Sequence, residues 1–303
     1  MLGPLLAALL CAVPTQEPAS PPEPPRLRAG ESARLELRAE TELEVETRLE
    51  SLVSTGKSRI TTVFQLELAV LAADAEGGGT LSLRLQRLEA EIVDASGRTR
   101  WDSEQRRAEP PDSPRADLLS ELARLEGASL EVELDRWYRL RARRGTEALA
   151  ARLGIAPDGA GLAPVMPWLW AAFPRDGRRE EQELELPVEA RTAPQGAERP
   201  RGPRLRATLE RVPADPAKEE RDGDAVIALQ LVPRETRASD GARRSLEMRG
   251  RFAFDAATGL LRRGELESVA FGAREARLDP GRPLLVASIN RAKSRYLWKR
   301  LGG

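Results

Sequence analysis

The stretch "ARLELRAETELEVETRLES", residues 33–51, alternates over almost its whole length between apolar or small uncharged residues and charged residues. Leu35, Leu37 and Leu43 share one parity, and Arg and Glu take almost every position of the other. A period of two is typical of a β-strand with one buried and one solvated face. Because a typical strand has about 5–6 residues, we expect either one long, bent strand or two strands that meet near Glu40.

The same alternation returns along the rest of the chain, between turns and charged loops. It recurs over residues 59–71, 81–92, 130–140, 184–188, 205–209, 227–231 and 246–254. Near Gln86–Arg87 the apolar positions change parity, and a β-bulge there would restore the face. Short connections favour antiparallel pairing. The sequence therefore predicts a mainly β fold with a few short helices, in which a large curved antiparallel sheet or half-barrel has its apolar concave face covered by the helices.

Two segments have the spacing of short helices. Leucines at 118, 119, 122 and 125 form a helical stripe that begins after Pro114 and ends at Gly127. Residues 146–153 predict a second helix, which Gly154 would close. The first helix and the apolar segment 163–174 are the expected cover of the sheet.

Composition excludes several kinds of chemistry. The chain has 303 residues, with 48 basic and 48 acidic side chains, and its net charge of zero gives no electrostatic case for nucleic-acid binding. It contains no His, which excludes His-dependent catalysis and His-ligated zinc. Cys11 is its only Cys, so no internal disulfide can form. We predict no catalytic, cofactor-binding or metal-binding residue.

The amino-terminal residues resemble an export signal. Leu2 to Val13 form an apolar run of signal-peptide length, although no Lys or Arg precedes it. We expect a signal peptide over residues 1–19 and a Pro-rich tether over 20–26. Cys11 raises the alternative of a lipid anchor, but Leu10 stands where a small residue is preferred. No later segment is long and apolar enough for a spanning helix.

The remaining chain divides by pattern into a β domain and a tail. The domain is expected over residues 27–290, with two similar halves over 27–160 and 175–290. Residues 291–303 form a locally basic carboxyl-terminal tail. Whether the two halves share one core stays open at this point.

Two groups of residues are candidate contact sites. The first is an apolar and aromatic group that could plug the concave face, form a lid or wall for an apolar ligand, or contact a partner or membrane: Met166, Trp168, Leu169, Trp170 and Phe173. The second is a basic group that could touch anionic lipid or nucleic acid, or form the solvated face of a last strand or helix: Arg291, Lys293, Arg295, Lys299 and Arg300.

Four stretches carry a resemblance to a known family. They are "LRAGESARLELRAE" from residue 27, "VLAADAEGGGTLSLRLQRLEAEI" from 70 with "WDSE" at 101, "LLSELARLEGASLEVELDR" from 118, and "GRFAFDAATGLLRRGELE" from 250. In this order they resemble a planctomycete-type family of secreted bacterial β-rich proteins, defined as a domain of unknown function. The resemblance implies an architecture similar to the half-barrels of lipoprotein carriers, which hold acyl chains on the concave face. The Arg-rich surface and basic tail of this chain depart from that pattern.

These features lead to one expected function and two alternatives. We expect an exported, non-enzymatic binding module of the cell envelope, with an apolar or lipid-like ligand or an envelope protein as its partner. The first alternative is a structural or protein-interaction domain with a filled core. The second is a hydrolase-type enzyme that uses carboxylates or a Ser–Lys pair. An open apolar cavity would favour the binding module, a fully filled core the interaction role, and convergent buried carboxylates the enzyme.

Overall fold

The computed structural model describes residues 23–49, 52–104, 124–145, 172–175, 177–185, 204–231, 236–237, 243–279 and 282–302. Over these residues the chain forms a single antiparallel sheet of 13 strands, which confirms the predicted fold class. The strands are β1 (Ser32–Leu49), β2 (Leu52–Ala73), β3 (Gly79–Asp94), β4 (Gly97–Asp102), β5 (Ser129–Leu134), β6 (Leu140–Arg144), β7 (Arg179–Glu185), β8 (Arg204–Val212), β9 (Ala225–Leu231), β10 (Thr236–Arg237), β11 (Arg243–Phe254), β12 (Leu261–Asp279) and β13 (Arg282–Arg300). The two predicted helices lie almost wholly outside the described residues.

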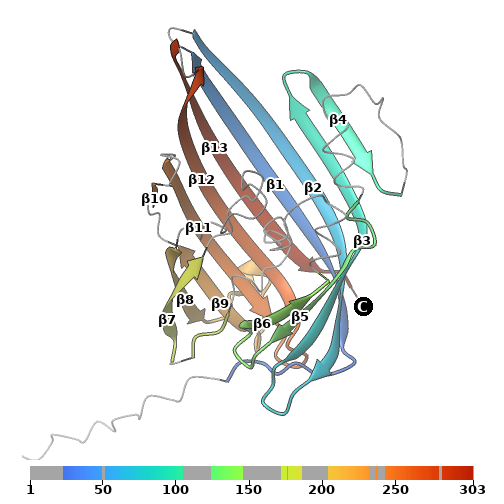
Figure 1. The fold of residues 1–303 in the computed structure, drawn as a ribbon. Coiled ribbons are helices and arrows are strands. Elements are labelled where there is room, and N and C mark those ends of the chain that lie inside the picture. The colour runs from blue at the N-terminus through green and yellow to red at the C-terminus, as the bar shows by residue number, and fades with distance from the viewer. Residues whose placement is uncertain are drawn as a thin grey trace, which may run out of the picture.

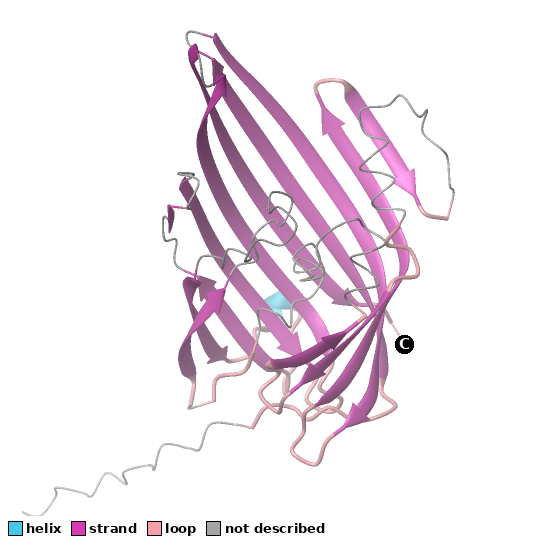
Figure 2. Cartoon of the chain, in the orientation of Figure 1, coloured by secondary structure: helices cyan, strands magenta, loops and turns pink. Residues whose placement is uncertain are grey.

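The strand order joins the two halves of the chain at the middle of the sheet. The order is β6-β5-β3-β2-β1-β13-β12-β11-β9-β8-β7, with β4 paired to β3 and β10 to β11. The first strand and the last are therefore central neighbours, and each half extends outward from them. Figure 1 shows the sheet curling around a concave side, and Figure 2 shows short turns gathered at one end, which we call the base.

The opening ribbon is one strand. β1 pairs without a register shift with β2 on one side and with β13 on the other, from Leu35 to Leu49. The long single strand is thus correct, and the alternative of two strands near Glu40 is wrong. The predicted bulge is confirmed, because Gln65 pairs with Arg87 while the next residue of β2 pairs with Leu85.

The base is filled by a single buried cluster. Leu35 and Leu134 of the first half belong to the same cluster as Leu209, Phe254 and Trp298 of the second. Burial of one such side chain contributes about 1.5–3 kcal/mol. The two predicted halves therefore share one core and one sheet.

Aromatic rings form the centre of the base. Tyr138 lies with its ring centroid 5.1 Å from that of Phe173 and 5.2 Å from that of Phe254. Its hydroxyl donates to the carbonyl of Gly259 at 2.6 Å, and burial raises its pKa. Phe252 packs on Trp298 with ring centroids 5.6 Å apart. Geometries of this kind are favourable beyond the area that they bury.

The start of the described chain packs against the base. Pro24 and Pro25, which fall in the predicted tether, are buried, and so is Leu27. The backbone N–H of Leu27 donates to the carbonyl of Gly77 at 3.2 Å. Packing therefore begins three residues before the predicted start of the domain at residue 27.

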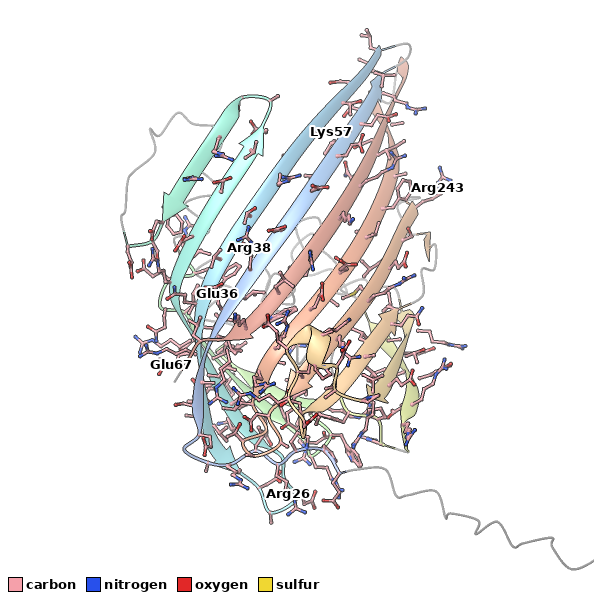
Figure 3. The ribbon with its side chains drawn as sticks, turned by 180° about the vertical axis from the view of Figure 1, so that it is seen from behind. Arg26, Glu36, Arg38, Lys57, Glu67 and Arg243 are labelled. Atoms are coloured by element: carbon pink, nitrogen blue, oxygen red, sulfur yellow. The ribbon has the colours of Figure 1, made fainter. Side chains whose placement is uncertain are left out.

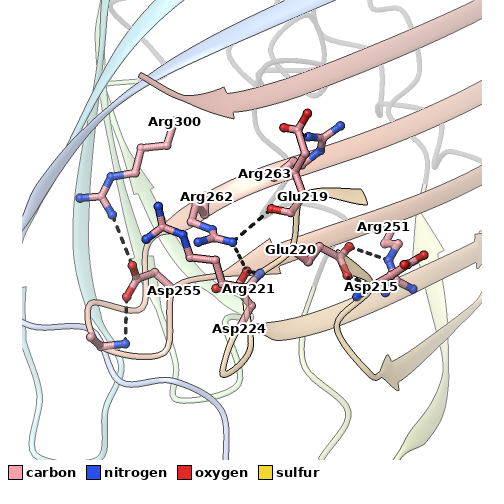
Figure 4. A network of polar contacts seen from close by, with 11 residues as sticks. Asp215, Glu219, Glu220, Arg221, Asp224, Arg251, Asp255, Arg262, Arg263 and Arg300 are labelled. Atoms are coloured by element: carbon pink, nitrogen blue, oxygen red, sulfur yellow. Dashed lines mark hydrogen bonds and ion pairs between the residues drawn. The ribbon is translucent and has the colours of Figure 1, made fainter. Parts of the chain in front are cut away.

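A strap of residues 213–224, between β8 and β9, is fixed to the sheet by arginines (Figure 4). Arg251 of β11 donates to Glu220 at 2.6 and 2.7 Å, and Arg262 of β12 donates to Asp224 at 2.6 Å. Burial opposes the ionisation of Glu220, but the bonds from Arg251 and from a backbone N–H outweigh it and hold the pKa of Glu220 below its ordinary value. These paired, largely buried charges hold the strap in place.

The outer face of the sheet is charged, as the alternation predicts. Figure 3 shows this face, with Glu36, Arg38 and Lys57 on it. Cross-strand ion pairs form here, and Arg59 lies 2.6 Å from Glu42. Such exposed pairs contribute little, about 0.2–1 kcal/mol each. The outer face therefore keeps the sheet solvated, and the stabilisation comes from the other side.

Candidate binding face

The inner face of the four central strands β2, β1, β13 and β12 has two zones. Near the base its side chains are fully enclosed, with Leu37 and Trp298 at 0% and 1% exposure. On β1 the strict alternation of burial ends at Ala39, although the alternation of sequence continues to Leu49. Beyond Ala39 the inward positions of β1 are partly exposed. The sheet thus extends well past its own core.

We call this second zone the upper inner face. Cross-strand register places its members on the same side of the sheet as the core. They are Thr41, Leu43, Val45 and Thr47 of β1, Ser58 and Ile60 of β2, Ser268, Ala270 and Gly272 of β12, and Ser288, Asn290 and Ala292 of β13.

The members of the upper inner face are uncharged, and most of them are small; the next position of the same parity in β12 is Arg274, which pairs with Ser288. Leu43 pairs with Ser58 on one side and with Ala292 on the other, and Ala292 pairs in turn with Ala270. Leu43, Val45 and Ile60 are not part of the buried cluster. The result is a broad surface of methyl, methylene and hydroxyl groups on which an apolar chain could lie.

Hydroxyl groups mark the boundary between the two zones. Thr41 and Ser294 are bonded to each other with their oxygens 3.0 Å apart, and Thr62 and Ser294 are buried. Burial raises the pKa of the neighbouring Tyr296, whose ring stacks on Trp298. Hydroxyl groups carry no charge, and those of Thr41 and Ser294 are hydrogen-bonded to each other. This boundary therefore presents polar but uncharged groups to a ligand.

The predicted aromatic group is only partly described. Met166, Trp168, Leu169 and Trp170 lie outside the described residues. Phe173 is fully buried in the base, where its backbone N–H donates to the carbonyl of Trp137 at 2.8 Å. Its position fits the predicted plug, and the role of the other four residues stays a prediction.

The predicted basic tail is instead part of a central strand. β13 runs from residue 282 to 300, and therefore crosses the predicted boundary at 290 without a break. Arg291, Lys293, Arg295 and Lys299 are exposed. The number of basic residues suggested a tail. Their alternation with Ala292, Tyr296 and Trp298 is instead typical of a strand with a solvated face, which was the other interpretation of this group.

Two of these basic residues have ion-pair partners. Arg295 lies 2.6 Å from Glu265 of β12, and this contact raises the pKa of Arg295. Arg300 lies 3.6 Å from Asp255 in the turn before β12. These two residues serve the sheet itself, and the structure does not set the group apart as a separate contact site.

Side chains bridge the two ends of the sheet at the base. Arg139, just before β6, donates to Glu180 of β7 at 2.5 Å and to Gln182 at 3.3 Å. Arg175 lies 3.5 Å from Asp135. We call this contact region the seam. It draws the base together although the two end strands, β6 and β7, are not paired in the sheet.

Sequence reasoning missed the seam and also Arg211, whose backbone N–H donates to the carbonyl of Arg178 beside β7, although a signal for Arg211 was present. In β8 the residues Leu205, Ala207 and Leu209 share the apolar parity, and Arg211 takes the next position of that parity. Arg211 pairs with Ile227, which confirms that it lies on the inner face. A charge at an apolar position of an alternating strand could have marked this residue.

Among the described residues, Asp135 and Glu220 are buried as whole residues, and each has a structural partner. Asp135 accepts backbone N–H bonds from Trp137 and Arg139 at 2.8 and 2.9 Å, and so orders its own turn. Glu220 belongs to the strap described above. Within the described residues no three Cys, Asp or Glu side chains come close enough to hold a metal ion. The described part of the chain also contains no helix with the length and apolar character to cross a bilayer.

No protein-family model matches the chain, and no curated protein matches it. Among solved structures it is similar to lipovitellin, in a structure of lipid–protein interactions, with a TM-score of 0.46 and 8% identity over 91% of this chain and 25% of that chain. It is also similar to a DUF1329 family protein from Desulfovibrio piger, with a TM-score of 0.14 and 10% identity over 85% of this chain and 83% of that chain. A third neighbour is OccK7 (OpdD) from Pseudomonas aeruginosa, with a TM-score of 0.20 and 10% identity over 89% of this chain and 99% of that chain.

The chain thus spans a quarter of the lipovitellin chain that it matches. Its neighbours include a lipid-associated β-rich protein and a member of a domain-of-unknown-function family. With TM-scores below 0.5, these similarities do not assign a function. Membership of a planctomycete-type family stays a prediction.

Proposed function

We propose that the chain is an exported, non-enzymatic binding module that holds an apolar or lipid-like ligand on the upper inner face. One observation carries the proposal: past Ala39 the inward positions of β1, β2 and β13 continue as an uncharged surface outside the buried cluster, bordered in β12 by Arg274. Covering apolar surface contributes roughly 25 cal/mol for each Å². An acyl chain laid on this surface would gain that free energy without having to displace an ion pair.

Two further features support the proposal. The apolar run from Leu2 to Val13 has the character of an export signal, and export would bring the protein to envelope lipids. Trp168 and Trp170 belong to the most apolar segment that follows this run, and we assign to them the cover of the bound chain.

A protein-interaction role is the second candidate, and exposed apolar residues favour it. Leu52 and Val53, at the start of β2, are 70% and 61% exposed. Side chains of this kind can mark a contact with a partner. The filled base fits this role as well, since it leaves no internal site there.

A charge placed on the upper inner face should abolish ligand binding. The probe is tritiated oleyl alcohol, retained by the full chain through gel filtration. Leu43→Asp should lower the retention at least about tenfold, because a carboxylate against an alkyl chain loses its hydration. Val269→Asp is the matched control, since Val269 is a 48% exposed apolar residue of β12 on the outer face, and it should bind like the unmodified chain.

Three results would count against the proposal. Equal loss in both variants would mean that the effect is not specific to the inner face. Full retention by Leu43→Asp would place the probe elsewhere. If the unmodified chain retains no probe at all, the interaction role is the better account, and Leu52 and Val53 become its first candidate contacts.

A further inference from the structure

Arg211 is a charged residue in an otherwise apolar row of the inner face. The row crosses the sheet through Ile227, Phe252, Gly264 and Trp298, and it continues through Leu37, Phe64 and Leu88. The apolar members of this row are buried. Arg211 stands at the β8 end of the row, next to the seam.

The guanidinium of Arg211 is partly buried, and no carboxylate of the described residues forms an ion pair with it. It lies over the ring of Phe173, 5.1 Å from the centroid. Its Nε is buried and has no hydrogen-bond partner, and burial lowers the pKa of Arg211. Arg251, by contrast, donates to Glu220, and that bond raises the pKa of Arg251. A partly buried charge without a counter-ion is costly, and a protein that keeps one has a use for it.

The nearby carboxylates of the seam are already bound. Glu180 accepts from Arg139 and from the backbone N–H of Arg175. Asp135 accepts backbone bonds of its own turn and faces Arg175. The two carboxylates of the described seam are thus paired with Arg139 and Arg175, and neither is paired with Arg211.

We propose that Arg211 binds the anionic head of an amphiphile, a carboxylate or a phosphate monoester, whose acyl chain lies on the upper inner face. This inference rests on the proposed function. A guanidinium presents several N–H donors in a planar fork that fits such an oxyanion. Phe173 packs against one face of the guanidinium and orients the fork.

The position of Arg211 fits a ligand whose anionic head lies at Arg211 and whose acyl chain lies on the upper inner face. Its row passes through Trp298 and Leu37, and two residues further along β1 lies Ala39, beyond which the upper inner face begins. Arg211 is four strands away from β13 in the sheet, which is about 19 Å along its surface. A long acyl chain can cover this interval while its head remains at the seam.

The test compares two probes that share one alkyl chain. Tritiated oleate and tritiated oleyl alcohol are bound to the full chain by equilibrium dialysis, in the unmodified protein and in Arg211→Met. Oleate should bind roughly tenfold more tightly than the alcohol. Arg211→Met should lower oleate binding to the level of the alcohol and leave alcohol binding unchanged, while Arg211→Lys keeps part of the preference.

Arg206→Met is the matched control. Arg206 is an exposed residue of the same strand, paired with Glu181 at 3.8 Å, and its loss should change neither probe. Bound tritiated oleate is then displaced with oleoyl lysophosphatidate or with unlabelled oleate. The stronger competitor shows whether Arg211 prefers a phosphate or a carboxylate head group.

The outcomes separate this inference from the proposed function. Equal binding of oleate and oleyl alcohol by the unmodified chain would overturn the role of Arg211 and leave the apolar site standing. A preference for oleate that survives Arg211→Met would place the anion elsewhere and also overturn it. Failure of both probes to bind would overturn the proposed function itself.

Discussion

Replacing Phe252 by Ala should destabilise the protein by about 3–5 kcal/mol, at the upper end for core aromatic residues. Phe252 is fully buried and packs on Trp298. Glycines stand on both sides of its ring, since a Cβ on Gly250 or on Gly264 would lie 2.9 Å from it. Because the two glycines have no side chains that could move into the space, much of the cavity would stay open. Urea unfolding of the full chain, followed by Trp fluorescence, measures the change.

Phe271→Ala provides the control for this prediction. Phe271 is a partly exposed aromatic residue of β12 on the outer face, where it pairs with Arg291. Its removal should cost about 1 kcal/mol or less. If the two variants lose the same stability, the base is not the dense core described here.

Gly259→Ala should strongly destabilise the base, although it adds only one methyl group. Gly259 has φ of +73°, which costs a residue with a Cβ about 1–2 kcal/mol. The new Cβ would also lie 2.4 Å from the hydroxyl oxygen of Tyr138 and 2.9 Å from the carbonyl oxygen of Arg26. Overpacking of this kind adds about 1–3 kcal/mol. The Tyr138 hydrogen bond to Gly259 would have to break or shift, and the midpoint of urea unfolding should fall accordingly.

Gly127→Ala separates the two contributions. Gly127 has φ of +66°, close to that of Gly259, but nothing lies within 4 Å of its Cβ position. It should show the backbone cost alone. Equal destabilisation by both variants would mean that the contact of Gly259 with Tyr138 is not tight.

The alternation of sequence predicted which face of each strand is buried, and it did so residue by residue. Leu35 and Leu37 are enclosed while Arg34 and Arg38 are exposed. Even the shift at Gln86 could be predicted, because a bulge is the usual way to keep apolar residues on one side. A period of two records only the side to which a residue points.

What covers a face cannot be predicted from its period. Leu37 and Leu43 have the same parity and are both flanked in the sequence by charged residues, yet one is enclosed and the other is partly exposed. The difference arises because the seam draws the two ends of the sheet together only at the base. Arg139 and Glu180 are far apart in the chain, so neither the seam nor the place of Arg211 next to it could be derived from local pattern.

Local charge was misleading at the carboxyl end. Residues 291–303 contain several basic side chains, and charge alone suggested a tail. The alternation of Tyr296 and Trp298 with charged residues carried the correct information, because Trp298 is one of the most completely buried side chains of the described core. Where charge and period disagree, the period is the better guide to the fold.

Native mass spectrometry of the chain, purified gently from a bacterial envelope, tests the central claim most directly. The account predicts a co-purifying mass of lipid size, held by the unmodified chain and lost in Leu43→Asp or when Trp168 and Trp170 are both changed to Ala. A spectrum of the bare chain, with no uptake of added oleate or oleyl alcohol, would contradict it.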